Sequence, residues 1–219
     1  MKPRGVGIGP LCLLVGVALS VLSCGNPAWA ALLADNANAL DGWHDTLIAE
    51  HSSGEDVLSM KVDYAVFAPG QYPGQVPDKD SQYVYAYQAF NQAVSTVALT
   101  AFSVGLDPLA DADNIGDDAS AGQPGVGGGV SPDLAIVGTS SARWGWGWIG
   151  GFEVGADEHS TVVLFTSPNA PTWDTATMLN GGFPTPVGLL PSPVPEPATA
   201  GLLALGLAAM LGKWRRSRV

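Results

Sequence analysis

The 219-residue chain has little charge, and almost none of the charge in its middle is positive. Charged residues make up 13% of the chain, about half the usual share, which excludes a coiled coil or a long, charged helix bundle. Residues 31–197 contain all 20 acidic side chains but only three basic ones, Lys61, Lys79 and Arg143. Because phosphates are bound by Lys and Arg, this balance excludes nucleic acid as a partner and disfavours phosphorylated substrates.

Cysteine is also nearly absent, and Cys12 and Cys24 both precede residue 31. A domain that begins there has no disulfide, no thiolate metal site and no cysteine nucleophile. The segment also lacks a Gly-x-Ser-x-Gly elbow, a P-loop and a His-Glu-x-x-His metal motif. We therefore expect a protein that is not an enzyme and has no cofactor. A pair of distant carboxylates for glycoside hydrolysis remains the open enzymatic alternative, because such pairs share no motif.

The N-terminus has the three parts of a secretion signal. A basic start is followed by an apolar run and a small-x-small cleavage site: Lys2, Arg4, residues 8–22, and Ala28 and Ala30 around Trp29. Residues 1–30 are therefore predicted to be a signal peptide, which signal peptidase removes to leave Ala31 as the first residue. The alternative is lipidation at Cys24, because the preceding Val-Leu-Ser is close to a lipobox.

The C-terminus is organised as a spacer, an apolar segment and a basic end. We predict a Pro-rich linker at 181–197, a transmembrane helix at 198–212 and a basic cytoplasmic tail at 213–219. Fifteen helical residues span about 22 Å, less than the roughly 30 Å membrane core, so length alone would also allow a buried helix. The flanking residues favour the membrane, since cationic side chains can reach its surface. These cations are Lys213, Arg215, Arg216 and Arg218.

This tail resembles a known sorting signal. Val194, Pro195, Glu196 and Pro197, then the apolar segment and the basic end, are similar to the PEP-CTERM signal of Gram-negative bacteria. The resemblance implies that an exosortase recognises the tail, and that the protein is anchored in the inner membrane before it reaches the cell surface or extracellular matrix. It also implies an association with exopolysaccharide. It assigns a destination and no activity, because many unrelated domains carry this signal.

The segment 31–180 has the pattern of a β-rich domain. The chain has 28 Gly and 17 Pro, which favours short strands and many turns. Residues 57–67 alternate apolar and polar side chains, which predicts a strand with one face in water. Further strands are predicted at 46–50, 82–91, 95–104, 134–137, 143–149, 161–166 and 176–179. The expected fold is all-β, an antiparallel β-sandwich of about seven to eight short strands.

A row of tryptophans is the first candidate binding feature. Trp144, Trp146 and Trp148 alternate with glycines, so an extended chain would place the three indoles on one face. Facing inward they would form core, and facing outward they would form a platform for sugar rings. The alternating glycines favour the core. Tyr83, Tyr85 and Tyr87 could likewise form core or a ligand platform, and the core is again favoured.

An acidic stretch is the second candidate. It contains five aspartates, which could ligate Ca²⁺ weakly: Asp107, Asp111, Asp113, Asp117 and Asp118. The spacing fails as an EF-hand, because Ile115 takes a ligand position and Gly122 stands where a glutamate is needed. A solvated loop is the expected structure. The favoured function is thus a surface- or matrix-associated structural or interaction protein, and the alternative is an exopolysaccharide-binding module that could use calcium.

Overall fold

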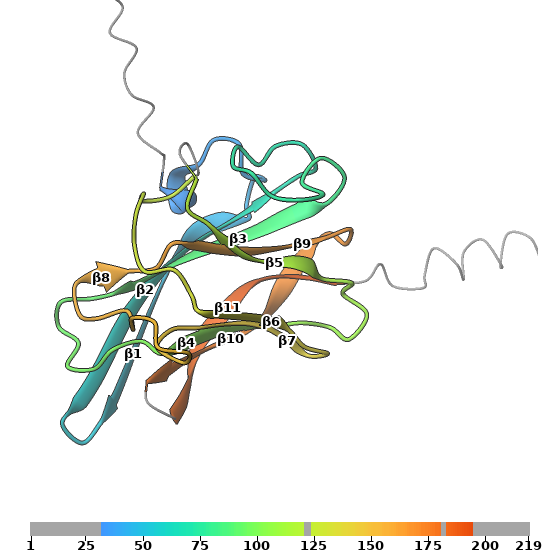
Figure 1. Ribbon diagram of the computed structural model, residues 1–219. Coiled ribbons are helices and arrows are strands. Elements are labelled where there is room, and N and C mark those ends of the chain that lie inside the picture. The colour runs from blue at the N-terminus through green and yellow to red at the C-terminus, as the bar shows by residue number, and fades with distance from the viewer. Residues whose placement is uncertain (1–31, 121–123, 181–182, 195–219) are drawn as a thin grey trace, which may run out of the picture.

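Two antiparallel sheets lie face to face in the computed structural model, which describes residues 32–120, 124–180 and 183–194 (Figure 1). The first sheet has the order β1 (His44–Ser53), β2 (Asp56–Phe67), β3 (Tyr83–Asn91), β9 (Val162–Ser167) and β5 (Asp113–Asp118), and the short β8 (Glu158–His159) pairs with β3. The second sheet has the order β11 (Phe183–Pro193), β10 (Pro171–Asn180), β4 (Ala101–Gly105), β7 (Ser141–Gly145) and β6 (Leu134–Val137). Among the described residues the helical content is one 3-10 turn, Leu33–Asp35. The prediction of an all-β fold with two antiparallel sheets is confirmed, but the described residues form eleven strands and not seven or eight.

The space between the sheets is filled by the residues that the alternation in β2 predicts. Leu58, Met60, Val62, Tyr64 and Val66 all belong to the central core cluster. Aromatic rings from both sheets complete it, and the rings of Phe102 and Trp144 stack with centroids 5.9 Å apart. A β-sandwich without disulfides depends on such burial, since each large aromatic side chain removes 150–250 Å² from water, as an order of magnitude.

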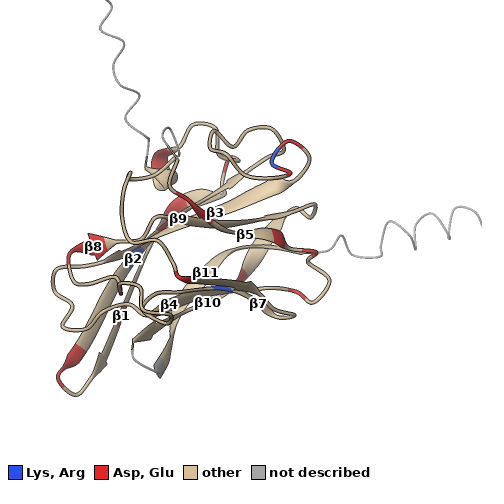
Figure 2. Cartoon of the chain, in the orientation of Figure 1, with Lys and Arg blue, Asp and Glu red and all other residues tan. Residues whose placement is uncertain are grey.

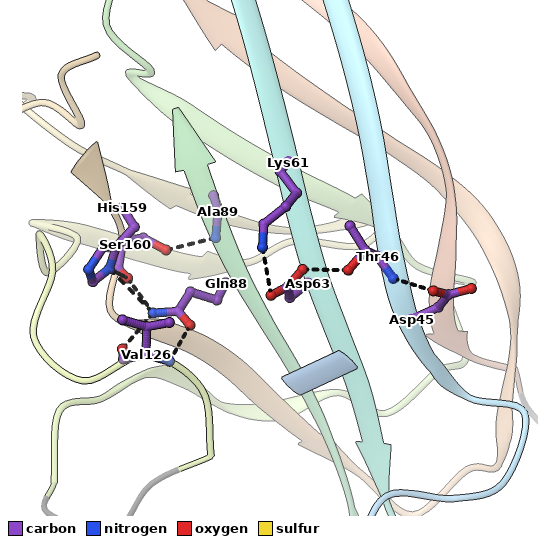
Figure 3. A network of polar contacts seen from close by, with 9 residues as sticks. All are labelled: Asp45, Thr46, Lys61, Asp63, Gln88, Ala89, Val126, His159 and Ser160. Atoms are coloured by element: carbon purple, nitrogen blue, oxygen red, sulfur yellow. Dashed lines mark hydrogen bonds and ion pairs between the residues drawn. The ribbon is translucent and has the colours of Figure 1, made fainter. Parts of the chain in front are cut away.

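The opposite face of β2 is not in water, so this part of the strand prediction is wrong. Ala65 and Phe67 pack with Leu33 and Tyr72 in a second apolar cluster, under the 3-10 turn and the segment 68–82. Asp63 is fully buried on the same strand. Its carboxylate accepts hydrogen bonds from Thr46 Oγ1 at 2.7 Å and Lys61 Nζ at 3.1 Å, as Figure 3 shows. These partners satisfy the buried charge.

A side-chain clamp also holds the segment around Val126 on the outer face of the first sheet. The Gln88 side chain donates to the carbonyl oxygens of Val126 and Ser160, and it accepts a hydrogen bond from the Val126 N–H (Figure 3). The three N···O distances are 2.8–2.9 Å. The outer face of the first sheet is therefore covered at both ends of β3.

The proline-rich segment is a strand, which corrects the predicted linker at 181–197. Residues 183–193 form β11, which pairs with β10 from Phe183 opposite Asn180 to Pro193 opposite Pro171. Val187 and Leu190 of β11 are buried in the central core. Prolines are tolerated because β11 is an edge strand, whose second side needs no hydrogen bonds. The folded domain thus extends to residue 193.

The strand directions define two ends of the sandwich. At the hairpin end lie the β1–β2 turn and the ends of β3, β7 and β10, namely Asn91, Gly145 and Asn180. At the tail end lie Phe67, Ser167 and Pro193. Figure 1 shows the hairpin and the last described residue of β11 on opposite sides of the domain.

Candidate functional site

The tryptophan row is divided between the core and the surface. Trp144 and Trp146 are fully buried, and their indole N–H groups donate to the carbonyl oxygens of Gly116 and Val130, both at 3.0 Å. The prediction of core is confirmed for these two. It is wrong for Trp148, which is 51% exposed. A platform of three indoles is therefore wrong, because β7 ends at Gly145 and the chain turns before the third tryptophan.

Two glycines explain where the Trp148 ring lies. Gly147 has φ = +75°, a left-handed conformation that reverses the chain direction after Trp146. The indole then folds back onto the outer face of the second sheet, with its ring centroid 4.4 Å from Arg143 Cζ. A Cβ at Gly145 would lie 3.4 Å from the Trp148 indole, so the missing side chain provides the room. The indole N–H donates to Thr100 O at 3.1 Å, which fixes the ring.

The loop that carries Trp148 is held by defined contacts. Asp133 Oδ2 accepts hydrogen bonds from the N–H groups of Ile149 at 2.8 Å and Gly151 at 3.3 Å. Val154, just beyond the loop, forms a β-bridge with Leu99. The anchored loop leaves two more apolar side chains in water, Ile149 at 74% and Phe152 at 83% exposure. Residues 147–153 therefore present an ordered apolar surface.

A groove lies beside this loop at the hairpin end. A hollow of about 390 Å³ is lined by Arg143, Trp148, Glu153 and Leu179, among others. A second hollow of about 350 Å³ is lined by His51, Asp56 and Asn180, among others. The two share Thr100 and Glu153, so we treat them as one surface, the tip groove. Each hollow has the volume of a small-ligand site, about 300–1,000 Å³.

Arg143 is an unusual cation in this acidic protein. In the described part of the chain the one ion pair joins Lys61 and Asp63, while Lys79 Nζ donates to Tyr72 O at 3.3 Å. Arg143 has no carboxylate at ion-pair distance among these residues, although Figure 2 shows many acidic positions. Arg143 Nε and Asn180 Oδ1 have no hydrogen-bond partner within the described residues. The tip groove thus holds polar groups whose capacity the fold does not use.

The tyrosine row is structural. Tyr85 and Tyr87 are buried in the core, and their hydroxyls donate to the carbonyl oxygens of Asn169, at 2.8 Å, and Pro191. Burial raises the pKa of both hydroxyls well above the usual value, with a smaller contribution from the neighbouring tyrosine in each case. Both side chains therefore stay protonated and serve as hydrogen-bond donors. The prediction of core is confirmed for these two, while Tyr83 is partly buried and packs against the core.

The five candidate calcium ligands do not converge. Asp113–Asp118 form strand β5, and therefore not the solvated loop that we expected there. Asp118 is buried and accepts a hydrogen bond from the Tyr72 hydroxyl at 3.0 Å, while Asp117 accepts one from Thr161 at 2.9 Å. Asp107 accepts one from the Leu109 N–H at 2.9 Å. Nowhere in the described ranges do three His, Cys, Asp or Glu side chains form a group that could hold a metal ion.

Most of the predicted targeting residues lie outside the described residues. These are the cleavage residues Ala28, Ala30 and Ala31, the motif residues Pro195, Glu196 and Pro197, and the basic cluster Lys213, Arg215, Arg216 and Arg218. The predicted transmembrane helix lies there too, and the described part of the chain has no helix that could cross a bilayer. Val194 is described, and its N–H donates to Ala170 O at 3.2 Å.

Comparison with known proteins decides what the tail is. Residues 193–217 match the family model of the PEP-CTERM protein-sorting motif. The chain carries a PEP-CTERM sorting motif. No curated protein and no solved structure matches the chain. The PEP-CTERM match begins at Pro193, the last residue of β11, so the sorting motif follows the folded domain without a spacer.

Sequence reasoning missed most of the tip groove. Four of its lining residues belong to no sequence motif: His51, Thr100, Glu153 and Asn180. The usable signal was the glycine-rich segment after Trp146, where Ile149 and Phe152 lie between glycines that can turn the chain.

Proposed function

We propose that this protein is a non-enzymatic structural or interaction protein, which is exported, processed by an exosortase and associated with the cell surface or extracellular matrix. The observation that carries the proposal is the continuity between the last strand and the PEP-CTERM motif. A folded domain that runs directly into a sorting motif would be held close to the point at which the chain is anchored.

The contacts of the histidines support a non-enzymatic role. His44 Nδ1 lies 2.6 Å from Ala34 O, and the His159 ring packs against Phe90 with centroids 5.5 Å apart. His44 therefore contacts the 3-10 turn that covers the first sheet, and His159 packs on a neighbouring strand, whereas His51 lines the tip groove.

We also propose carbohydrate binding as a second candidate function, and Trp148 favours it. A half-exposed indole beside a polar groove is the kind of surface that can stack a sugar ring. The calcium-dependent form of this function is not included, because Asp107, Asp117 and Asp118 each bond to a different structural partner and the described residues hold no group of three metal-ligating side chains.

Two tail variants test the sorting function. Glu196→Ala should still insert in the membrane but should escape exosortase cleavage, so the chain is expected in the membrane fraction at uncut mass. Replacing Lys213, Arg215, Arg216 and Arg218 by Ser should weaken retention, because 15 apolar residues alone are marginal for a bilayer. That variant is expected in the soluble fraction, also uncut. If a host with an exosortase processes both variants like the parent, the proposed sorting is wrong.

A further inference from the structure

We propose that the tip groove binds an uncharged polysaccharide chain, with Trp148 as the stacking surface and Arg143, Glu153 and Asn180 as hydrogen-bonding groups. This inference deepens the proposed function, since it names the ligand class that an exported protein of this kind would meet. It depends on the site's geometry and chemistry.

The groove combines the two kinds of surface that a sugar ring needs. A pyranose has an apolar C–H face and a rim of hydroxyl groups that both donate and accept hydrogen bonds. The exposed Trp148 indole offers a flat apolar face, while the guanidinium, carboxylate and amide around it offer donors and acceptors. Arg143 Nε and Asn180 Oδ1 are buried beside the groove and have no hydrogen-bond partner within the described residues.

The indole is already in position before a ligand arrives. Its N–H bond to Thr100 O, the stacked Arg143 and the two Asp133 contacts fix both the ring and its loop. A fixed ring loses little conformational freedom on binding, which improves affinity for a given contact area. The core does not require a fixed Trp148 ring, because Trp144 and Trp146 already fill the core at and just after β7.

The position of the groove indicates a ligand far from the anchoring point. Val194, which leads into the sorting motif, leaves the tail end, whereas Trp148 and Asn180 lie at the hairpin end. The 11 residues of β11 separate these ends by about 35 Å, at roughly 3.3 Å per residue. Trp148 therefore lies at the end of the domain that is farther from the point where the sorting motif begins.

The charge of the domain selects an uncharged polymer. Three basic side chains against 20 acidic ones in residues 31–197 give a field that repels a polyanion, although salt screens it beyond about 8–10 Å. Inside the groove the single cation, Arg143, is accompanied by Glu153 and Asp56. A polyuronate would place its carboxylates near these groups, whereas neutral hydroxyls can bond to either charge.

The test uses the processed protein purified from its host. Its migration in native gels that contain dextran, a soluble β-glucan, galactomannan, alginate or polygalacturonate reports binding, and a titration with the best polymer gives the affinity. We expect retardation by at least one uncharged polymer and none by the two polyanions. Trp148→Ala should weaken binding about tenfold or more.

Two further variants keep the test decisive. Glu153→Gln leaves Trp148 in place and should also weaken binding, while Trp173→Ala should not. Trp173 is a suitable control, because it is 44% exposed but stacks on Trp43 with centroids 4.9 Å apart, outside the groove. Thermal unfolding of each variant confirms that it is folded.

Three results would overturn this inference: retardation by polyanions alone, no retardation at all, or equal binding by the parent and Trp148→Ala. Self-association that Trp148→Ala abolishes, without glycan binding, would also overturn it, because the groove would then contact a second copy. These outcomes are separate from the sorting test. A chain that is correctly processed but binds no glycan removes only the groove proposal, and a chain that binds but is not processed removes only the sorting proposal.

Discussion

A chain that ends at Asn180 is expected not to fold, although it contains the whole segment from which sequence patterns predict the β-rich domain. Without β11 the core loses Val187 and Leu190, and β10 loses one of its two strand partners. The Tyr87 hydroxyl loses its acceptor, the carbonyl oxygen of Pro191. Each lost aliphatic side chain alone is worth about 2–5 kcal/mol, against a total stability of about 5–15 kcal/mol for a typical domain.

The matched control is a chain that ends at Val194, which keeps all of β11. Circular dichroism during heating should show one cooperative transition for this chain and none for the chain ending at Asn180. Limited proteolysis should degrade the chain that ends at Asn180 and leave the chain that ends at Val194 resistant. A cooperative transition at the same temperature in both chains would show that β11 does not contribute to the fold.

Trp144→Ala is the point substitution for which we expect the largest loss of stability, about 3–5 kcal/mol, which is typical of removing a buried aromatic side chain. The Trp144 ring packs within 5.9–6.3 Å of Tyr87, Phe102 and Phe165, measured between centroids. Its indole N–H also donates to Gly116 O, so the substitution leaves that acceptor without its partner. Urea unfolding measures the change in the free energy of unfolding.

Trp148→Ala is the internal comparison for this substitution. The same side chain is removed from the same sequence row, but from a position that is half exposed. Its expected cost is about 1 kcal/mol, for the lost contacts with Thr100 and Arg143. Similar losses for the two variants would contradict the assignment of Trp144 to the core and Trp148 to the surface.

The central β-sheet pattern could be predicted because local alternation and tertiary burial agree there. In β2 the apolar residues at every second position from Leu58 to Val66 face the core, as expected. The burial of the opposite face could not be predicted from the alternation in β2. It depends on Leu33, which is distant in sequence, and on Tyr72, which belongs to the segment that covers the sheet. The alternation predicts that Asp63 is exposed to solvent, but its side chain is buried and accepts hydrogen bonds from Thr46 and Lys61.

Three strands were missed: the two-residue β8, and β5 and β11, whose residues are unfavourable for strands in general. The prolines of β11 indicate an extended linker, and only the position of β11 at a sheet edge makes a strand possible. The aspartates of β5 indicate a solvated loop, but Asp117 and Asp118 have hydrogen-bond partners in the fold. Edge position and long-range partners are properties of the tertiary structure, which a short sequence window does not contain.

The tryptophan row shows how a single glycine can change a candidate site. Strict alternation from Trp144 to Trp148 predicts one face for all three indoles, which holds only while the chain stays extended. Gly147 takes a left-handed conformation, and the third indole moves to the outer surface. The result is one exposed tryptophan in a polar groove, which sequence alternation alone would have placed in the core.

The continuity of the folded domain with its sorting motif is tested most directly by the mass of the mature protein from its native host. The account predicts a chain that begins at Ala31, retains the whole of β11 through Pro193 and lacks residues 198–219. An N-terminus at a lipidated Cys24 would contradict the predicted secretion signal. A chain that keeps residues 198–219 in a host with an exosortase, or that is cut within β11, would contradict the central claim.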